Sequence, residues 1–277
     1  MQYKEKAGTP GFFHEKAGMC MEERLLEELR SADMLLIGIG EEFEERTFLD
    51  TQPEYRDGAE YLEQIGRMDL LPLLADGIIR DRGRAVAALE RLYQTVKDKN
   101  FFLISTCQTD ILNYAGFPRE RTVTPCGTLE KKQCVCGCEQ SLAQVSDSER
   151  TELYRAITGR DREPGMLGIC PECHGKMALN NIYLEKYMES GYLENWHRYT
   201  KWLQGTLNRR LCILELGVNL DYPTVIRFPF EKTAYYNQKA LFVRVNGRLY
   251  HLTEELHERG ISMAKNAIDW LLAEDIL

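Results

Sequence analysis

Two pairs of cysteines in one stretch of the chain have a spacing that could bind a metal ion. The pairs are Cys134-x-x-x-Cys138 and Cys170-Pro-Glu-Cys173. Thiolates from two such turns, four in all, form a tetrahedral Zn²⁺ site. The sequence CPECHG at 170–175 favours this interpretation, because its backbone can wrap around the ion. The sequence therefore predicts a structural zinc site whose ligands are Cys134, Cys138, Cys170 and Cys173.

The first pair leaves one alternative open, because Cys136 could replace Cys138 as a ligand. His174 is a less favoured ligand beside the second pair. An iron–sulfur cluster or a set of redox-active thiols would also need clustered cysteines. A closed site of four cysteines has no free coordination position. We therefore expect the metal to stabilise the fold rather than to take part in a reaction.

The elements that must position these cysteines alternate between strands and helices. Four apolar runs of strand length are MLLIGIG (34–40), NFFLIST (100–106), RLCILELGV (210–218) and ALFVRVN (240–246). Helical patterns cover residues 20–33, 59–98, 181–205 and the C-terminal segment 261–277. This alternation predicts an α/β fold, a Rossmann-like parallel sheet with helices on both faces. The first strand ends in Gly38-Ile39-Gly40, a turn typical of dinucleotide-binding folds.

The composition excludes several classes of protein. The net charge is −8, from 35 Lys and Arg against 43 Asp and Glu, which argues against nonspecific binding to nucleic acid. No apolar run approaches the ~20 residues that a membrane-spanning helix needs. The first residues carry lysines but no apolar stretch, so we expect no signal peptide. Without such a signal we take the compartment as reducing, where clustered cysteines form a metal site more often than disulfides. We expect a cytoplasmic protein without nucleic-acid or membrane partners.

The order of these elements resembles that of the sirtuins, most closely the class M sirtuins of microbes. The best-matching segments are ADMLLIGIG (32–40), AGF (115–117), CPECHGKMALN (170–180), ILELGVNLDYPTVIRFPF (213–230) and ALFVRVN (240–246). The resemblance covers most of the chain between about residues 30 and 250. It implies an NAD site at the carboxyl edge of the sheet and, in class M members, protein ADP-ribosyltransferase activity.

The resemblance also implies which residues would form the NAD site. Gly38, Gly40, Gly217 and Asn246 match positions that contact the cofactor in the family. Other positions depart from it, and these departures make NAD a doubtful cofactor. The family's Asn-x-Asp motif is replaced by the segment Cys107 to Thr109, with Asp110 as a substitute one place later, and its His-Gly motif by Cys126-Gly127. Without that histidine we expect no deacylation by the usual sirtuin route.

Two glutamates, Glu41 and Glu42, follow the Gly-x-Gly turn, where the family has a small residue and a serine. A helix N-terminus at such a turn attracts anions through its free N–H groups and its dipole. Two like charges ~4 Å apart repel by about 4 kcal/mol where the effective dielectric constant is about 20. A carboxylate at that place therefore repels a pyrophosphate. Two arrangements are open. The glutamates point to solvent from a shifted loop, or they cap the helix and fill the anion site from within.

We expect three structural parts and weigh three functions. Residues 1–40, 100–127 and 181–277 are predicted to form the Rossmann-like domain, 41–99 a helical insertion, and 128–180 a zinc-ribbon module. The first function is a sirtuin-like binding or scaffold protein with a degenerate NAD site and an unidentified protein partner or acceptor. The second is a divergent NAD-dependent ADP-ribosyltransferase of the class M type. The third is a cleft that takes another ligand and uses the thiols of Cys107 and Cys126.

Overall fold

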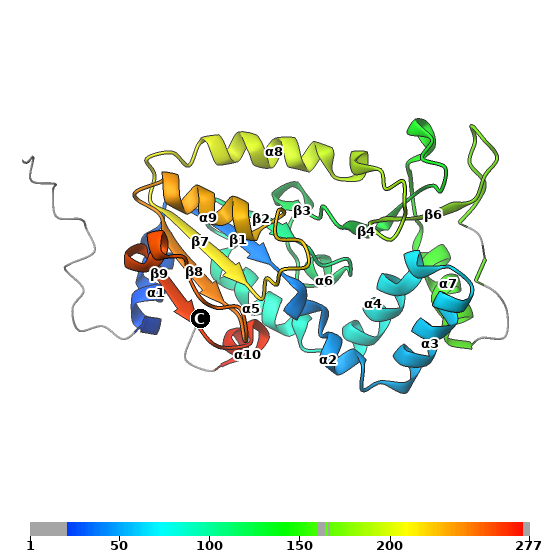
Figure 1. Ribbon diagram of the computed structural model, residues 1–277, viewed down its shortest axis with the longest axis horizontal. Helices are drawn as coiled ribbons and strands as arrows, with labels where there is room; N and C mark the ends of the chain where they lie inside the picture. The colour runs from blue at the N-terminus through cyan, green and yellow to red at the C-terminus, as the bar shows by residue number, and fades with distance from the viewer. Residues whose placement is uncertain (1–20, 160–163, 166, 274–277) are drawn as a thin grey trace, which may run out of the picture.

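The structure is a computed structural model that describes residues 21–159, 164–165 and 167–273. The chain forms a large lobe around one parallel sheet and a small lobe that holds a second sheet and several helices (Figure 1). The outer ends of the predicted Rossmann-like domain, at both termini of the chain, lie outside the described residues.

The sheet of the large lobe has six parallel strands. They are β1 (Met34–Ile39), β2 (Phe101–Ser105), β3 (Thr122–Val123), β7 (Leu211–Leu216), β8 (Leu241–Val245) and β9 (Gly260–Met263). Their order is β3-β2-β1-β7-β8-β9, so the chain moves outward in one direction from β1 and in the other from β7. The loops that follow β1 and β7 therefore run in opposite directions and leave a crevice between them at the carboxyl edge of the sheet. Rossmann-type folds bind ligands in such a crevice.

Helices cover both faces of this sheet, and its central strands are buried throughout. One face carries α8 (Leu193–Gln204) and α9 (Arg227–Tyr236); the other carries α1 (Met21–Ser31), α5 (Ala85–Val96), α6 (Ile111–Tyr114) and α10 (Ala267–Leu272) (Figure 1). Side chains alternate along β1, so Leu36 packs under α9 and Leu35 packs on the opposite face. The predicted fold class, a Rossmann-like sheet between two helical layers, is confirmed.

The small lobe combines two segments that are distant in the sequence. Its antiparallel sheet has the order β5-β4-β6 and consists of β4 (Gly127–Cys134), β5 (Ala143–Gln144) and β6 (Met177–Asn181). Its helices are α2 (Arg46–Leu49), α3 (Pro53–Gln64), α4 (Leu71–Arg82) and α7 (Asp147–Gly159). Leu62, Leu74 and Ile157 from α3, α4 and α7 lie in one buried cluster. The two insertions therefore share a core rather than folding as separate modules.

Short 3-10 helices join the larger elements. They are η2 (Glu41–Glu44), η3 (Met68–Leu70), η4 (Arg119–Arg121), η5 (Glu139–Ser141), η6 (Glu189–Gly191) and η7 (Glu254–Arg259). Of these, η2 bears most directly on function, since it begins one residue after Gly40 at the crevice. In the described chain no helix is long and apolar enough to cross a membrane.

Several predicted boundaries differ from the structure. The segment 261–277 was expected to be one helix, but β9 occupies its start and α10 begins only after Asn266, whose side chain accepts from the N–H groups of Ile268 and Asp269. Helix α5 lies in the predicted insertion 41–99, yet it packs beside α10 in the large lobe. Helix α7 inside 128–180 was not expected. It forms because its apolar positions pack on α3 and α4.

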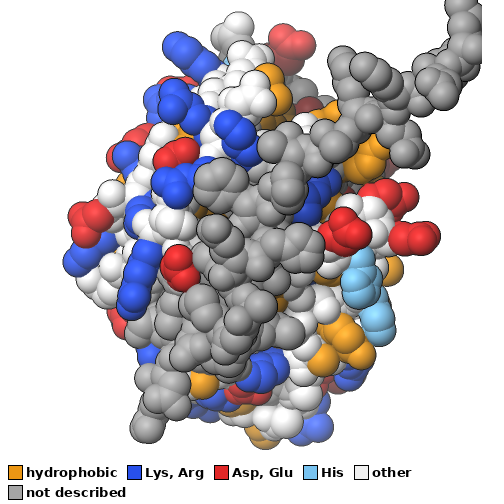
Figure 2. All heavy atoms as spheres, turned by 90° about the vertical axis from the view of Figure 1, so that its left-hand side faces the viewer, with side chains coloured by type: hydrophobic (Ala, Val, Ile, Leu, Met, Phe, Trp, Pro, Cys, Tyr) orange, Lys and Arg blue, Asp and Glu red, His pale blue; other side chains and the backbone are white. Residues whose placement is uncertain are grey.

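The end of the large lobe that lies at the left of Figure 1 carries mixed side chains. Figure 2 shows acidic, basic and apolar groups interspersed over the described part of this face. A single-sign field of the kind that attracts a polyanion is therefore not formed by the described residues there.

Candidate functional site at the carboxyl edge of the main sheet

The segments after β1, β7, β8 and β9 meet around one cleft at the crevice between β1 and β7. The cleft has a volume of about 740 Å³, and its lining includes Glu41, Glu42, Asn219, Gly247, Arg248 and Asn266. These residues come from four different loops, which is typical of ligand sites in Rossmann-type folds. The place that the sequence predicted for a cofactor is thus a real cleft.

Neighbouring protein atoms leave no room for a side chain at the glycines of the Gly-x-Gly turn. A Cβ on Gly40 would lie 2.3 Å from Val218 Cα and 2.5 Å from the Gly217 carbonyl oxygen, so the loops after β1 and β7 approach closely there. A Cβ on Gly38 would lie 2.6 Å from Ile226 Cγ2. Gly217 has φ 64°, the left-handed conformation that favours glycine. Packing within the chain therefore accounts for these three predicted cofactor positions.

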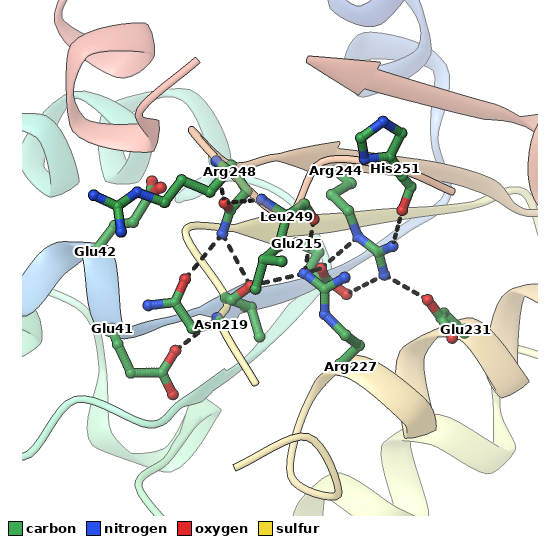
Figure 3. A network of polar contacts seen from close by, with 12 residues as sticks. Glu41, Glu42, Glu215, Asn219, Arg227, Glu231, Arg244, Arg248, Leu249 and His251 are labelled. Atoms are coloured by element: carbon green, nitrogen blue, oxygen red, sulfur yellow. Dashed lines mark hydrogen bonds and ion pairs between the residues drawn. The ribbon is translucent and has the colours of Figure 1, made fainter. Parts of the chain in front are cut away.

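Glu41 and Glu42 bind backbone N–H groups at the edge of the cleft. Figure 3 shows the bond from Asn219 to Glu41. Glu41 is only 4% exposed, and its Oε2 accepts from the Asn219 N–H at 2.8 Å. Glu42 accepts from the Gly247 N–H through Oε1 and from the Ala267 N–H through Oε2, both at 2.8 Å. The two carboxylates thus occupy donors on the loop after β7, on the loop after β8 and at the start of α10.

Of the two arrangements expected for these glutamates, the geometry favours filling from within. The donors differ from those expected, because they belong to distant segments and not to the helix that Glu41 begins. Burial raises the pKa of Glu42, and its bonds to Ala267 and Gly247 oppose that shift. The two backbone N–H bonds favour the carboxylate form of Glu42, but burial outweighs them, so its pKa stays above the usual value.

Two further glutamates of this segment were missed from the sequence. Glu44 Oε1 accepts from the Gln108 N–H at 3.1 Å, and burial raises the pKa of Glu44. Glu45 Oε1 accepts from the N–H groups of Arg84 and Ala85, at 2.7 and 2.8 Å, where α5 begins. The available signal was the composition EEFEE directly after a buried strand, since acidic side chains so placed can cap neighbouring backbone donors.

Asn246, predicted to contact the cofactor, fastens the loops of the cleft to one another. Its Oδ1 accepts from the N–H groups of Arg248 and Leu249, and its Nδ2 donates to the Val218 carbonyl oxygen at 2.9 Å. Arg227 donates to the carbonyl oxygens of Val218 and Leu249 at 2.8 and 2.9 Å. Both residues therefore hold the loops after β7 and β8 together.

A buried charge network under these loops explains two ionic residues inside the sheet. Arg244 in β8 forms a two-pronged ion pair with Glu215 in β7, at 2.6 and 3.0 Å, and a second pair with Glu231 on α9 at 2.7 Å (Figure 3). Arg227 lies 3.3 Å from Glu215. Opposite charges with this many hydrogen bonds can remain ionised inside a core. The network supports the loops without entering the cleft.

Cys107 and Cys126 are buried thiols. Cys107 Sγ donates to the Gly40 carbonyl oxygen at 3.2 Å. Burial raises the pKa of Cys107 well above its usual value, and the charges of Glu44 and Glu41 add to the shift. Burial raises the pKa of Cys126 in the same way, again with Glu41 and Glu44 nearby. Both thiols should stay protonated at neutral pH, which disfavours a nucleophilic role.

Thr109 and Asp110 line a second, smaller cavity of about 220 Å³ between the lobes. The Asp110 N–H donates to Asp76 Oδ1 at 2.8 Å, and the Asp110 carboxylate forms an ion pair with Arg150 of α7. Burial raises the pKa of Asp110 to about 7; the charge of Asp76 adds to this, and Arg150 opposes it. The proposed substitute for the family's aspartate therefore lies at a cavity but is engaged with the small lobe.

The four predicted metal ligands come together in the small lobe. One sulfur from each of Cys134, Cys138, Cys170 and Cys173 lies within 4.8 Å of the others. Two of them, Cys134 Sγ and Cys173 Sγ, are 3.4 Å apart. This cluster is compatible with a tetrahedral zinc site. The grouping contains Cys138 and leaves out Cys136, which is exposed.

No protein-family model matches the chain. A protein ADP-ribosyltransferase of Staphylococcus aureus strain Mu50 is 21% identical over 190 residues, which are 66% of this chain and 58% of the relative. A probable bifunctional ADP-ribose hydrolase/ADP-ribosyltransferase of Fusarium oxysporum f. sp. cubense is 28% identical over 121 residues, which are 42% of this chain and 20% of that relative. The chain thus spans little more than half the length of the first relative and a fifth of the second.

Solved structures of Sir2 proteins share the fold. A Sir2 homologue in complex with NAD superposes with a TM-score of 0.52 at 13% identity, and the match covers 94% of each chain. Sir2Tm bound to a propionylated peptide gives a TM-score of 0.51 at 11% identity and covers 91% of this chain and 96% of that one. The chain therefore has a sirtuin-like fold, and the resemblance drawn from the sequence is confirmed at that level.

Proposed function

We propose that the chain is a sirtuin-fold binding protein whose cleft does not take the pyrophosphate of NAD and which lacks deacylase chemistry. One observation carries the proposal. The carboxylates of Glu41 and Glu42 occupy the backbone N–H groups of Asn219, Gly247 and Ala267. Backbone donors of this kind bind phosphate oxygens in nucleotide sites. With the donors already filled by anions, a phosphate would have to displace a carboxylate.

The charge of the cleft supports the same proposal. Its lining holds five carboxylates and only three guanidinium groups; the acidic residues are Glu41, Glu42, Glu45, Asp221 and Asp269. Like charges a few ångströms apart repel by several kcal/mol where the effective dielectric constant is about 20. Such a lining favours neutral or positive ligands over a dianion.

The residues at the family's catalytic positions also argue against deacylation. Cys107 and Cys126 are buried thiols with raised pKa values, so neither replaces a histidine that gains and loses a proton near neutral pH. None of the histidines in the described part of the chain lines the larger cleft or the cavity at Asp110.

Calorimetry with NAD and with ADP-ribose tests the proposal on zinc-loaded protein. We expect no heat of binding for the wild-type chain at millimolar ligand. The double variant Glu41→Ala/Glu42→Ser should bind both ligands, because it frees the backbone donors and removes two negative charges. Adenosine carries no phosphate. If the wild-type chain binds adenosine but not ADP-ribose, charge repulsion excludes the nucleotide; if it binds neither, the shape of the cleft does. Micromolar binding of NAD by the wild-type chain would contradict the proposal.

A second candidate function is protein ADP-ribosyl transfer, which is favoured by the names of the two curated relatives. Asp110, with its pKa of about 7 at a cavity between the lobes, would be the carboxyl group available to it. Incubation with NAD labelled in its adenine ring, followed by separation of the proteins, would detect transfer. The label should depend on Asp110 and survive Asn113→Ala, a change in the same cavity.

A further inference from the structure

Buried oxygens without a hydrogen-bond partner gather where β1 and β2 end. In the described chain, four of them are Glu41 Oε1, Thr106 Oγ1, Gln108 Oε1 and Thr109 Oγ1, and we call their residues the acceptor cluster. None of the four residues is more than 7% exposed. Each of these oxygens can accept a hydrogen bond. Buried polar groups are nearly always paired, so this edge is suited to a partner that donates.

Glu41 adds a carboxylate to the acceptor cluster, and Arg227 attracts it without coming within ion-pair distance. Its Oε2 accepts one bond, from the Asn219 N–H, and its Oε1 accepts none. Among the described residues no ion pair reaches Glu41, whereas Glu44 beside it pairs with Arg46 at 3.4 Å. A buried carboxylate is costly unless a positive or strongly donating group pairs with it.

Contacts join the two segments that carry the acceptor cluster. The Gln108 N–H donates to Glu44, and Cys107 Sγ donates to the Gly40 carbonyl oxygen, so η2 lies directly over the segment after β2. Glu41 also lines the cleft of about 740 Å³. Glu41 is therefore the member of the acceptor cluster that borders a space large enough for a small molecule, while Thr109 lines the cavity of about 220 Å³.

We propose that the acceptor cluster binds the head group of an organic cation, a protonated amine or guanidinium, that enters from the cleft. A head group of this kind supplies several N–H donors and a positive charge. The donors match the unpaired oxygens, and the charge matches a carboxylate that has no ion-pair partner among the described residues. The inference rests on the proposed function, because it requires a cleft that is not a pyrophosphate site.

Calorimetry with agmatine, which carries both a guanidinium and an amine, tests the inference on the zinc-loaded full chain. We expect saturable binding by the wild-type protein and at least tenfold weaker binding by Glu41→Gln, which keeps the shape and the bond to Asn219 but removes the charge. Asp221→Asn is the matched control, since Asp221 is an exposed carboxylate on the same cleft. That variant should bind agmatine within twofold of wild type.

A second variant guards against a folding defect. Gln108→Met removes one orphaned oxygen without adding charge, and it should weaken agmatine binding severalfold while the circular dichroism spectrum stays unchanged. Equal weakening by Glu41→Gln and Asp221→Asn would overturn the inference in favour of nonspecific charge attraction. So would binding of Ca²⁺ or K⁺ that depends on Glu41 when agmatine shows none. If agmatine fails and NAD also does not bind, this inference alone is wrong; if NAD binds, the proposed function is wrong.

Discussion

The cysteine cluster and the glutamates of η2 gather side chains in opposite ways. The cluster draws four sulfurs of one kind toward a single point, within 4.8 Å of one another, and leaves no position for an outside group. The glutamates spread outward from one short segment, and each binds backbone donors of a different loop. The cysteine cluster uses all four sulfurs within one group. The glutamates occupy several backbone donors but leave Glu41 Oε1 without a hydrogen-bond partner.

The two regions therefore depend on their side chains in different ways. A closed cluster holds the small lobe whatever the cleft binds, because its ligands do not face the cleft. The carboxyl edge depends instead on single side chains, so two acidic residues are enough to change the charge that a ligand meets there. The predictions below test whether the two regions differ as described.

The largest effect is expected from the cysteine cluster. Cys170→Ser removes one of four ligands, so bound metal and the packing of the small lobe should be lost together. We expect stoichiometric zinc in the wild-type chain, far less in the variant, and a fall in Tm of about 10 °C. Metal analysis and thermal unfolding followed by circular dichroism measure both. Cys136→Ser is the control, and loss of zinc there would show that Cys136 is a ligand.

A smaller effect is expected from Gly40→Ala at the carboxyl edge. The added methyl group would lie 2.3 Å from Val218 Cα, so the backbone of one loop must move. Such overpacking should lower the free energy of unfolding by about 3 kcal/mol, measured by urea denaturation. Gly165→Ala in the cysteine-rich stretch is the matched change, because a Cβ there meets no atom within 4 Å. Similar losses in both variants would mean that close approach at Gly40 does not matter.

The smallest effect concerns pH and the contact between the lobes. The pKa of Asp110 rises from 3.8 to about 7 in the folded chain, because burial disfavours the carboxylate. The stability that this group contributes is therefore fully present below about pH 3.8 and is lost as the pH rises through about 7. Between about pH 6 and about pH 8 the loss should be about 1 kcal/mol.

Urea denaturation at the two pH values measures that loss. Asp110→Asn should remove this share of the pH dependence, and the raised pKa values of Asp76 and Glu44 should leave a remainder of the same sign. Asp221→Asn, an exposed change, should leave the wild-type dependence intact. A variant Asp110→Asn that kept the full dependence would assign it to the other buried carboxyl groups.

The sequence was informative where a pattern is local. The cysteine spacing predicted the four clustered sulfurs, and apolar runs of strand length predicted β1, β2, β7 and β8. It failed where tertiary contacts decide. Strand β9 has four residues and exists through its pairing with β8, and helix α7 has few apolar residues in a polar stretch. Patterns this short are too weak to distinguish from loops.

The partners of Glu42 are a second example of information that the sequence does not carry. Gly247 and Ala267 lie 205 and 225 residues away along the chain. Nothing local to Glu42 selects those two N–H groups over solvent, and only the strand order β1-β7-β8-β9 brings their loops to the carboxyl edge. A glutamate that caps a distant element is therefore visible only in three dimensions.

The adjacency of Glu41 and Glu42 also has a consequence for redesign of this edge. The two residues are neighbours in the chain, yet they bind donors on three separate segments. A change at either position alone uncovers some donors and still leaves a carboxylate facing any incoming phosphate. An anion-binding variant would therefore need both positions changed at once, because each single change loses internal bonds before any binding is gained.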